Sequence, residues 1–223
     1  LFTKNFSDNH LIIFGANTTE LYNSDEKYFN SLVVVDRNLN FIAKYDKKKL
    51  VPFGEFLPFE KQLGYFGIKK ITQGFNSFSK GLSDPIINIK FDAKNIKILP
   101  LICYEIIFPS YSEKYNEFNF IINISEDAWF GQSIGPYQHF AKAIFRSIEA
   151  QTFTIRSANM GISAFISPVG KVLKNLQPNE IGNIEISVSI LEKPKKKIKK
   201  DLIFLLLLFT YIFTFFILNK FKI

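Results

Sequence analysis

The feature that most constrains this chain is an uncharged apolar run near its C-terminus, residues 202–218. The run is close to the lower end of the roughly 17 to 25 residues with which a helix crosses a bilayer. No polar stripe at helical spacing gives it a face for water, which disfavours a partly exposed core helix. The sequence therefore predicts one C-terminal transmembrane helix over residues 202–218.

A basic tether, residues 193–201, lies directly before this helix and contains six lysines. The chain has a formal net charge of +8, and such an excess indicates an anionic partner, either nucleic acid or an acidic lipid surface. The tether has no interleaved aromatic residues, matches no nucleic-acid-binding module and abuts the apolar run. We therefore expect the membrane, and no nucleic acid, as its partner.

Residues 1–192 have the pattern of one domain built from short strands and tight turns. Strands outnumber helices, so the sequence predicts a layered α/β or α+β domain. A helix should begin at Gly135 and Pro136, because proline fits a first helical turn, and we expect it to pack through Phe140, Ala143, Ile144, Ser147 and Ile148. Strands are expected at residues 10–16, 31–36, 41–45, 86–91, 96–103, 120–124, 153–156, 163–166, 171–173 and 183–188.

The segment 52–84 breaks the strand pattern, because it combines repeated glycine with many aromatic residues, among them Phe53 and Phe56. A loop this long in a compact domain is usually functional or disordered, and this one is too aromatic for simple disorder. It is either a lid over a site or an irregular segment whose rings fill the core.

Cys103 is the only cysteine, so no disulfide can form within the chain and its thiol is free. It ends an expected strand, where a turn into a helix could expose its side chain. A thiol becomes a good nucleophile as a thiolate, beside positive charge, a helix N-terminus or a base. The residues alone leave two interpretations open, a buried core cysteine and a nucleophile.

Other candidate residues lie at the ends of neighbouring strands. The segment 45–49 contains consecutive lysines, and the chain then turns and presents Glu55. A lysine beside a reacting acyl group can stabilise an oxyanion. We interpret Lys48, however, as a charge exposed to solvent. Trp129, the only tryptophan, could wall a pocket or cap the core. We interpret His139 as structural.

With two histidines far apart and one cysteine, the sequence has no zinc-type ligand spacing, and we expect no metal and no cofactor.

Five segments, taken in order, resemble a known family. They are residues 50–55 (LVPFGE), 102–105 (ICYE), 127–131 (DAWFG), 135–139 (GPYQH) and 156–163 (RSANMGIS). The resemblance is to the bacterial apolipoprotein N-acyltransferases, a membrane branch of the nitrilase, or carbon-nitrogen hydrolase, superfamily. It covers essentially the whole chain, including the final apolar run.

The resemblance implies an α/β fold, a nitrilase-like αββα sandwich truncated at its N-terminus and followed by one transmembrane helix. It also implies a Glu, Lys, Cys triad in which Cys103 is the nucleophile and Lys47 the catalytic lysine. Glu55, Tyr104 and Glu105 match supporting positions in the active site. Trp129, Phe53 and Phe56 would then line a pocket or lid.

The reaction that the resemblance implies has two steps. Cys103 takes an acyl chain from a phospholipid to form a thioester, and the chain then passes to the α-amino group of a diacylglyceryl-modified cysteine at the N-terminus of an apolipoprotein. A thioester is reactive toward amines where water is excluded. The expected location is the bacterial inner membrane, multi-pass in the full-length protein and with a periplasmic catalytic domain, and we expect a monomer.

Some residues depart from the family pattern. Lys49 stands where the family usually has histidine, and Glu126 where it has asparagine; the triad glutamate of the family would fall before Leu1. The tether lysines would by themselves favour a cytoplasmic domain. Two alternatives therefore stay open: a membrane-tethered amidase of the nitrilase type, and a catalytically silent lipid-binding fragment that lacks the triad glutamate.

Overall fold

The computed structural model describes residues 6–22, 25–59, 77–91, 94–109, 117–190 and 200–221, together with residues 62, 65, 67, 111 and 115. The chain divides into two compact units, residues 1–191 and 192–223. The first unit carries both sheets, and the second contains the C-terminal helix. Most of the segment 60–76 and of the tether lies outside the described residues.

A three-stranded antiparallel sheet forms the first layer, with strand order β1-β2-β3. Its strands are β1 (Ile12–Tyr22), β2 (Asp25–Val35) and β3 (Phe41–Asp46). The central strand ends in a run of β-branched residues, the type that suits a paired and buried strand. Leu32 and Val34 project from this run into the core and are fully buried.

A six-stranded mixed sheet forms the second layer, with strand order β4-β5-β6-β7-β8-β9. Strands β5, β6 and β7 run parallel to one another, and the other neighbours are antiparallel. The strands are β4 (Ile87–Phe91), β5 (Lys94–Ile102), β6 (Phe120–Glu126), β7 (Phe153–Asn159), β8 (Ser163–Ile166) and β9 (Val172–Leu176). Because β5 and β6 are parallel, their C-terminal ends lie at the same edge of the sheet.

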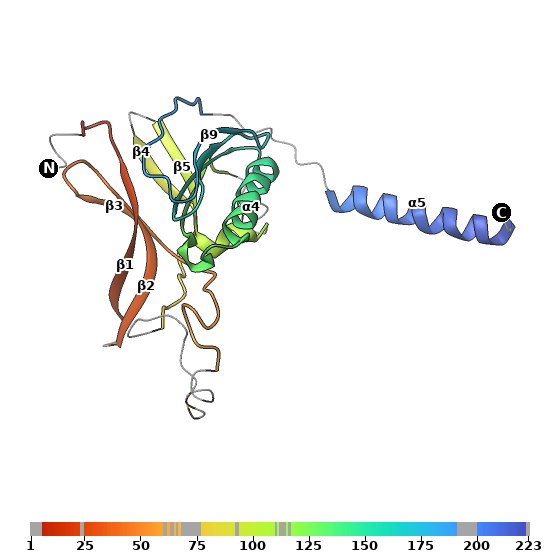
Figure 1. Cartoon of the computed structure of the whole chain (residues 1–223), viewed down its shortest axis with the longest axis horizontal. Helices are drawn as coiled ribbons and strands as arrows, with labels where there is room; N and C mark the ends of the chain where they lie inside the picture. The colour runs from red at the N-terminus through yellow and green to blue at the C-terminus, as the bar shows by residue number, and fades with distance from the viewer. Residues whose placement is uncertain are drawn as a thin grey trace. The chain divides into compact units, whose positions relative to one another are not determined.

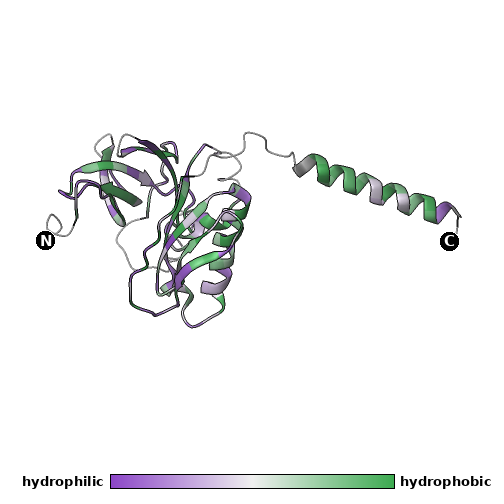
Figure 2. Ribbon diagram, turned by 90° about the horizontal axis from the view of Figure 1, so that it is seen from above, coloured by the Kyte–Doolittle hydropathy of each residue, from purple (hydrophilic) through white to green (hydrophobic). Residues whose placement is uncertain are grey.

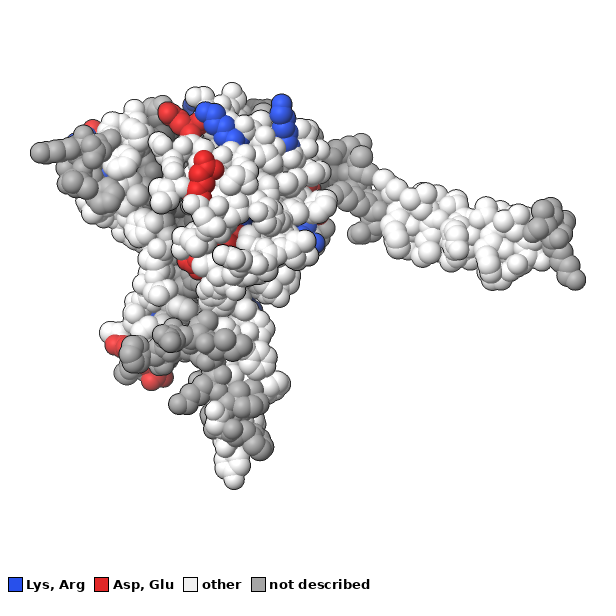
Figure 3. Space-filling view, viewed as in Figure 1, with Lys and Arg blue, Asp and Glu red and all other residues white. Residues whose placement is uncertain are grey.

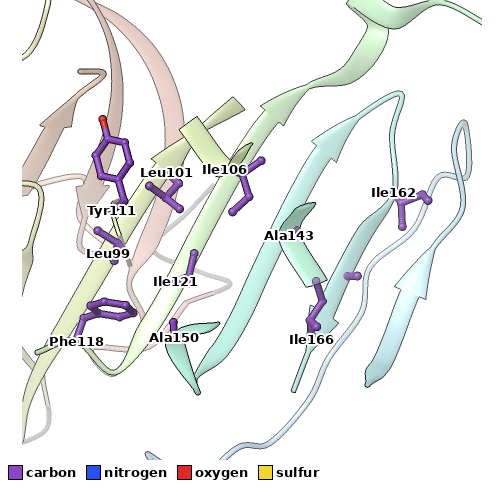
Figure 4. Close-up of a cluster of buried hydrophobic side chains, with 11 residues drawn as sticks. Leu99, Leu101, Ile106, Tyr111, Phe118, Ile121, Ala143, Ala150, Ile162 and Ile166 are labelled. Atoms are coloured by element: carbon purple, nitrogen blue, oxygen red, sulfur yellow. The ribbon is translucent and has the colours of Figure 1, made fainter. Parts of the chain in front are cut away.

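Helix α4 (Gly135–Ala150) covers one face of the six-stranded sheet, and the three-stranded sheet lies on the other side (Figure 1). One apolar cluster fills the space between the two sheets. The second lies between β5, β6, β8 and α4 and includes Leu99, Ile121 and Ala143 (Figure 4). The described residues thus form α, β and β layers, and the predicted α/β sandwich fold is confirmed.

Helix α5 (Lys200–Phe221) is the apolar helix that the sequence predicted. Within it, Leu202–Lys220 has a mean hydropathy of 2.5 and is long and apolar enough to cross a membrane. Its ribbon is hydrophobic along nearly its whole length (Figure 2), and its visible face carries no charged side chain between residues 202 and 218 (Figure 3). Length and composition therefore suit this helix to a bilayer.

Three expectations about the elements were wrong in part. Residues 183–188 are not a strand; every second side chain is half-buried, but the segment joins no sheet in the described part of the chain. Strand β1 runs on to Tyr22 through polar residues that carry no apolar alternation. Ile148 is 44% exposed, because the buried stripe of α4 instead follows Pro136, His139, Ala143, Arg146, Ser147 and Ala150.

Candidate active site

Cys103 occupies the sharp turn that follows β5. The strand ends at Ile102, and Cys103 begins the short 3-10 helix η1 (Cys103–Ile107). Its φ of 48° lies in the left-handed region, which residues other than glycine seldom adopt. Such strain costs on the order of 1–3 kcal/mol and persists only where the surroundings hold it. Cys103 forms no disulfide and is partly buried, packed against the apolar cluster between the two sheets.

Glu105 holds this turn against the neighbouring loop. Its side chain is fully buried, yet its carboxylate accepts hydrogen bonds from five donors. The donors are the backbone N–H groups of Ile102 (2.9 Å), Lys48 (2.8 Å) and Lys49 (3.0 Å), and the hydroxyls of Tyr45 (2.9 Å) and Tyr111 (2.9 Å). One carboxylate therefore fastens the cysteine turn to the segment after β3. Charge-assisted bonds of this kind are roughly twice as strong as neutral ones.

Tyr45 and Tyr111 are fixed as hydrogen-bond donors by their surroundings. Burial, and next the charge of Glu105, raise the pKa of both phenols far above the usual value. Both hydroxyls therefore keep their protons and donate to the carboxylate.

Lys47, the first residue after β3, forms a buried ion pair with Glu55. The Lys47 Nζ lies 2.8 Å from the Glu55 Oε1, and the two side chains are 1% and 7% exposed. Glu55 also accepts from the Asn30 Nδ2 and from the backbone N–H of Val51, both at 2.8 Å. Burying two charges is costly unless the geometry is good and further hydrogen bonds satisfy the pair, and here Glu55 accepts such bonds at both of its oxygens. The pair holds the ammonium in a fixed position.

A second buried network supports Cys103 from the side of α4 and β7. The His139 Nε2 lies 3.1 Å from the carbonyl oxygen of Cys103, and its Nδ1 lies 2.9 Å from the Asp127 Oδ1. The Asp127 Oδ2 accepts from the Arg156 Nη2 at 2.6 Å, and Arg156 also donates to the Asn123 side chain. Because the imidazole bridges a carboxylate and the strained turn, it fixes the backbone at Cys103.

The electrostatics of this network keep Asp127 ionised. Burial opposes ionisation, but the hydrogen bond from His139 and the charge of Arg156 outweigh it, so the pKa of Asp127 lies below its usual value. Burial lowers the pKa of Arg156, which the neighbouring carboxylate of Asp127 opposes. Asp127 and Arg156 therefore form a fully buried ion pair.

A groove of about 500 Å³ adjoins the cysteine turn, within the size range of small-molecule pockets. Its apolar lining comprises Leu50, Pro52, Phe56, Phe78, Tyr104 and Phe108. Tyr104 directly follows Cys103, and its ring meets that of Phe108 edge-on with centroids 5.0 Å apart. The groove is therefore lined by the residue that follows Cys103.

The other two aromatic residues expected at a pocket or lid are not among those that line this groove. Trp129 is 55% exposed and Phe53 43%. The Trp129 ring packs against Gly54, where an added Cβ would lie 2.8 Å from the Cζ3 atom. Both therefore lie on the surface near the 52–56 turn. About half of the remaining aromatic segment, residues 57–84, falls outside the described residues.

The structure brings most of the expected residues into one region. Glu105 connects the Cys103 turn to the segment after Lys47, and Lys47 pairs with Glu55. Sequence reasoning assigned no role to Asp127 or Arg156, and it interpreted His139 as structural without its contact with Cys103. The only signal for these three was that they lie within the quoted motifs. The described residues contain no group of three or more His, Cys, Asp or Glu that could hold a metal ion.

Solved structures resemble this fold. A Saccharomyces cerevisiae member of the nitrilase superfamily matches with a TM-score of 0.52 and 19% identity, covering 75% of this chain and 56% of the other. A Nesterenkonia amidase of the same superfamily matches with a TM-score of 0.53 and 15% identity, covering 77% of this chain and 59% of that one. The fold is therefore that of the nitrilase superfamily.

Sequence comparison narrows this class. The carbon-nitrogen hydrolase family model matches residues 6–192, and the chain belongs to that family. Two curated relatives are the apolipoprotein N-acyltransferases of Rhizobium leguminosarum bv. trifolii (40% identical over 81% of this chain and 34% of the relative) and Rickettsia typhi (39% over 80% and 35%). The chain spans about a third of the length of these relatives.

Proposed function

We propose that this chain carries the acyl-transfer centre of an apolipoprotein N-acyltransferase. In this reaction an acyl chain leaves a phospholipid, becomes a thioester on Cys103, and then acylates the N-terminal amine of a diacylglyceryl-cysteine lipoprotein. The observation that carries the proposal is the Glu105 carboxylate, which fastens the strained turn of Cys103 to the segment that follows Lys47. The names of the relatives point to the same activity.

In the first half-reaction the Cys103 thiolate attacks the ester carbonyl carbon. The carbonyl oxygen becomes an oxyanion, and collapse of this intermediate breaks the bond to the glycerol oxygen. That oxygen takes up a proton, and a lysophospholipid leaves. Glu55 and Glu105 already accept several hydrogen bonds, so neither is free to remove the thiol proton. That task stays with the separate glutamate that the family resemblance implies.

Lys47 acts as the cation of the site. Its ammonium is buried and held by Glu55 at 2.8 Å, so it needs no reorganisation when negative charge develops. A preorganised donor of this kind stabilises the oxyanion more than a solvated one does. Glu55 positions the ammonium, Glu105 positions the cysteine turn, and Tyr104 and Phe56 contribute apolar groove surface for the acyl chain.

In the second half-reaction the amine of the lipoprotein attacks the thioester carbonyl. The amine nitrogen forms an amide bond, the carbon–sulfur bond breaks, and the departing thiolate returns to its starting state. Water competes with the amine, so the site must exclude it. Trp129 and Phe53, exposed near the 52–56 turn, would cover the site when both lipids are bound.

The proposed location is the bacterial inner membrane, with the catalytic domain on its periplasmic side and further spans in the whole protein. Helix α5 supports a membrane location by its length and hydropathy. We propose that the enzyme acts as a monomer. Protease added outside intact spheroplasts should cleave the domain; protection from the protease would contradict the periplasmic side.

The experiment that tests the activity is detection of the acyl-enzyme. The protein, expressed from its complete reading frame and placed in phospholipid vesicles, should gain one acyl mass on the peptide that contains Cys103. Hydroxylamine should remove it, because thioesters react with hydroxylamine, and Cys103→Ala should never acquire it. An adduct on the alanine variant would refute the assignment. Hydrolysis of soluble amides with no adduct from lipid would identify an amidase, and binding without turnover would identify a silent module.

A further inference from the structure

Three lysines share the groove beside Cys103 with its apolar lining. They are Lys48, Lys49 and Lys80, and no acidic side chain is among the described residues that line the groove. An apolar surface bordered by positive charge is complementary to a molecule with a hydrocarbon part and an anionic part. The groove therefore has the two properties that a phospholipid requires of its binding site.

The backbone of each lysine is fixed by hydrogen bonds. The N–H groups of Lys48 and Lys49 donate to the buried Glu105 carboxylate. Lys80 lies between two anchors, because the N–H of Phe78 donates to the Glu55 carbonyl at 2.8 Å and the N–H of Gly81 donates to the Lys47 carbonyl at 2.9 Å. The three lysine side chains thus extend from a backbone that these hydrogen bonds hold in place.

Glycine is required at the second of these anchors. A Cβ on Gly81 would lie 2.1 Å from the Asp46 carbonyl oxygen, so the two backbones approach more closely than any side chain would allow. This contact, together with the hydrogen bond from the Gly81 N–H to the Lys47 carbonyl, holds the backbone next to Lys80 against the segment that leads into Lys48 and Lys49.

The three ammonium groups have no carboxylate partner within the described residues. The lysines that form ion pairs there are Lys44, Lys47 and Lys97. Lys49 has only an aromatic neighbour, since its Nζ lies 5.4 Å from the centre of the Phe108 ring. Three unneutralised charges around one groove repel one another, and an anionic ligand would relieve that repulsion.

We propose that Lys48, Lys49 and Lys80 form a headgroup subsite that selects an anionic phospholipid, with phosphatidylglycerol as the probe, as the acyl donor. This inference rests on the acyl transfer proposed above. Every phospholipid has a phosphodiester that the subsite can bind, but zwitterionic headgroups also bring an ammonium or choline cation against the lysines. The subsite therefore favours a headgroup without its own cation.

The size of the expected preference follows from the number of lysines. Each lysine near an anionic lipid surface raises the affinity on the order of fivefold, and salt at 0.1 M screens part of this attraction. Three lysines therefore predict a preference of at least about tenfold for phosphatidylglycerol over phosphatidylcholine. Each lysine removed should reduce that ratio by up to about fivefold.

The test is a competition within one membrane. The complete protein is reconstituted in vesicles of fixed composition that contain equal trace amounts of phosphatidylglycerol and phosphatidylcholine, whose acyl chains carry different mass labels. Both donors then experience the same surface potential, including any effect of the tether lysines, so the ratio of labels on Cys103 reports on the site alone. We expect at least about ten phosphatidylglycerol-derived adducts for each one from phosphatidylcholine.

The variant Lys49→Gln/Lys80→Gln should lower this ratio at least about fivefold. Its matched control is Lys90→Gln/Lys94→Gln, which removes the same charge from exposed residues of the β4–β5 hairpin that do not line the groove; the ratio should not change. Equal labelling from both donors, or a ratio that both double variants lower alike, would overturn the headgroup subsite. The absence of any Cys103 adduct would instead overturn the proposed function.

Discussion

The buried carboxylate of Glu105 is the part of the site whose removal has the most predictable effect. In Glu105→Gln the shape is retained, but the charge is lost and one oxygen becomes an NH₂ group. Four donors meet the Oε1 atom and one, the N–H of Ile102, meets the Oε2 atom. With the glutamine oxygen facing the four donors, the Ile102 N–H faces another donor. An unsatisfied buried group costs about 1–3 kcal/mol, and each of the four bonds loses its charge assistance, worth on the order of 1 kcal/mol.

These terms sum to more than their true effect, because bonds that share one acceptor are not additive and a neutral side chain is easier to bury. We therefore expect a local destabilisation of about 3–5 kcal/mol. The assay is hydrogen exchange, followed by mass spectrometry, of the amides of Lys48, Lys49 and Ile102. Since 1.4 kcal/mol is tenfold, their exchange should accelerate at least about a hundredfold.

The matched control is Glu117→Gln, the same chemical change on a side chain that is 82% exposed and pairs with Lys97 at the surface. A surface pair contributes at most about 1 kcal/mol, so exchange in the site should stay close to that of the wild type. If Glu105→Gln accelerates exchange at Lys48, Lys49 and Ile102 no more than this control does, the carboxylate does not hold the turn.

Three further predictions concern the surroundings of Cys103. Asp127→Asn leaves the Arg156 charge buried without its partner and should cost about 3–5 kcal/mol at pH 7. The pKa of Asp127 is lowered in the folded protein, so the carboxylate contributes its full stabilisation above its usual pKa of 3.8 and loses it as the pH falls below that value. The difference in Tm between the wild type and Asp127→Asn should therefore shrink between pH 7 and pH 3, and a constant difference would contradict this. His139→Ala should slow formation of the Cys103 adduct about tenfold, the cost of one buried hydrogen bond, and an unchanged rate would remove its positioning role. Gly54→Ala should displace Trp129 and shift the fluorescence of this only tryptophan; an identical spectrum would show that the ring is not held there.

The strands with strong apolar patterns could be predicted from the sequence. Strand β5 ends at Ile102, one residue before the expected end at Cys103, and the hairpins around residues 37–40 and 92–95 pair as expected. The outer half of the β1–β2 ribbon could not be predicted, because its polar residues are held by pairing with each other and not by a buried face. At residues 183–188 the alternation reflects half-burial without a strand partner in the described residues.

For the site, too, the sequence predicted some features and not others. The motifs pointed to Cys103, Lys47, Glu55 and Glu105, but the reasons for their geometry depend on contacts between distant segments. The bond from Lys48 to Glu105 spans 57 residues and that from Arg156 to Asp127 spans 29. No local pattern encodes these distances; they follow from β6 lying parallel to β7 and from the two sheets packing together. Only the folded chain shows that His139 contacts the backbone of Cys103.

A pulse and chase tests whether one acyl group passes through Cys103 to an amine. The complete protein is first loaded from vesicles of acyl-labelled phospholipid, freed of excess donor, and then given a synthetic diacylglyceryl-cysteine peptide with a free N-terminus. We expect the label to leave Cys103 and to appear, in equal amount, as an amide on that peptide, whereas a peptide with an acetylated N-terminus should leave the adduct in place. Label that reaches the peptide at the same rate in Cys103→Ala, or that leaves Cys103 only as free fatty acid, would contradict transfer through Cys103.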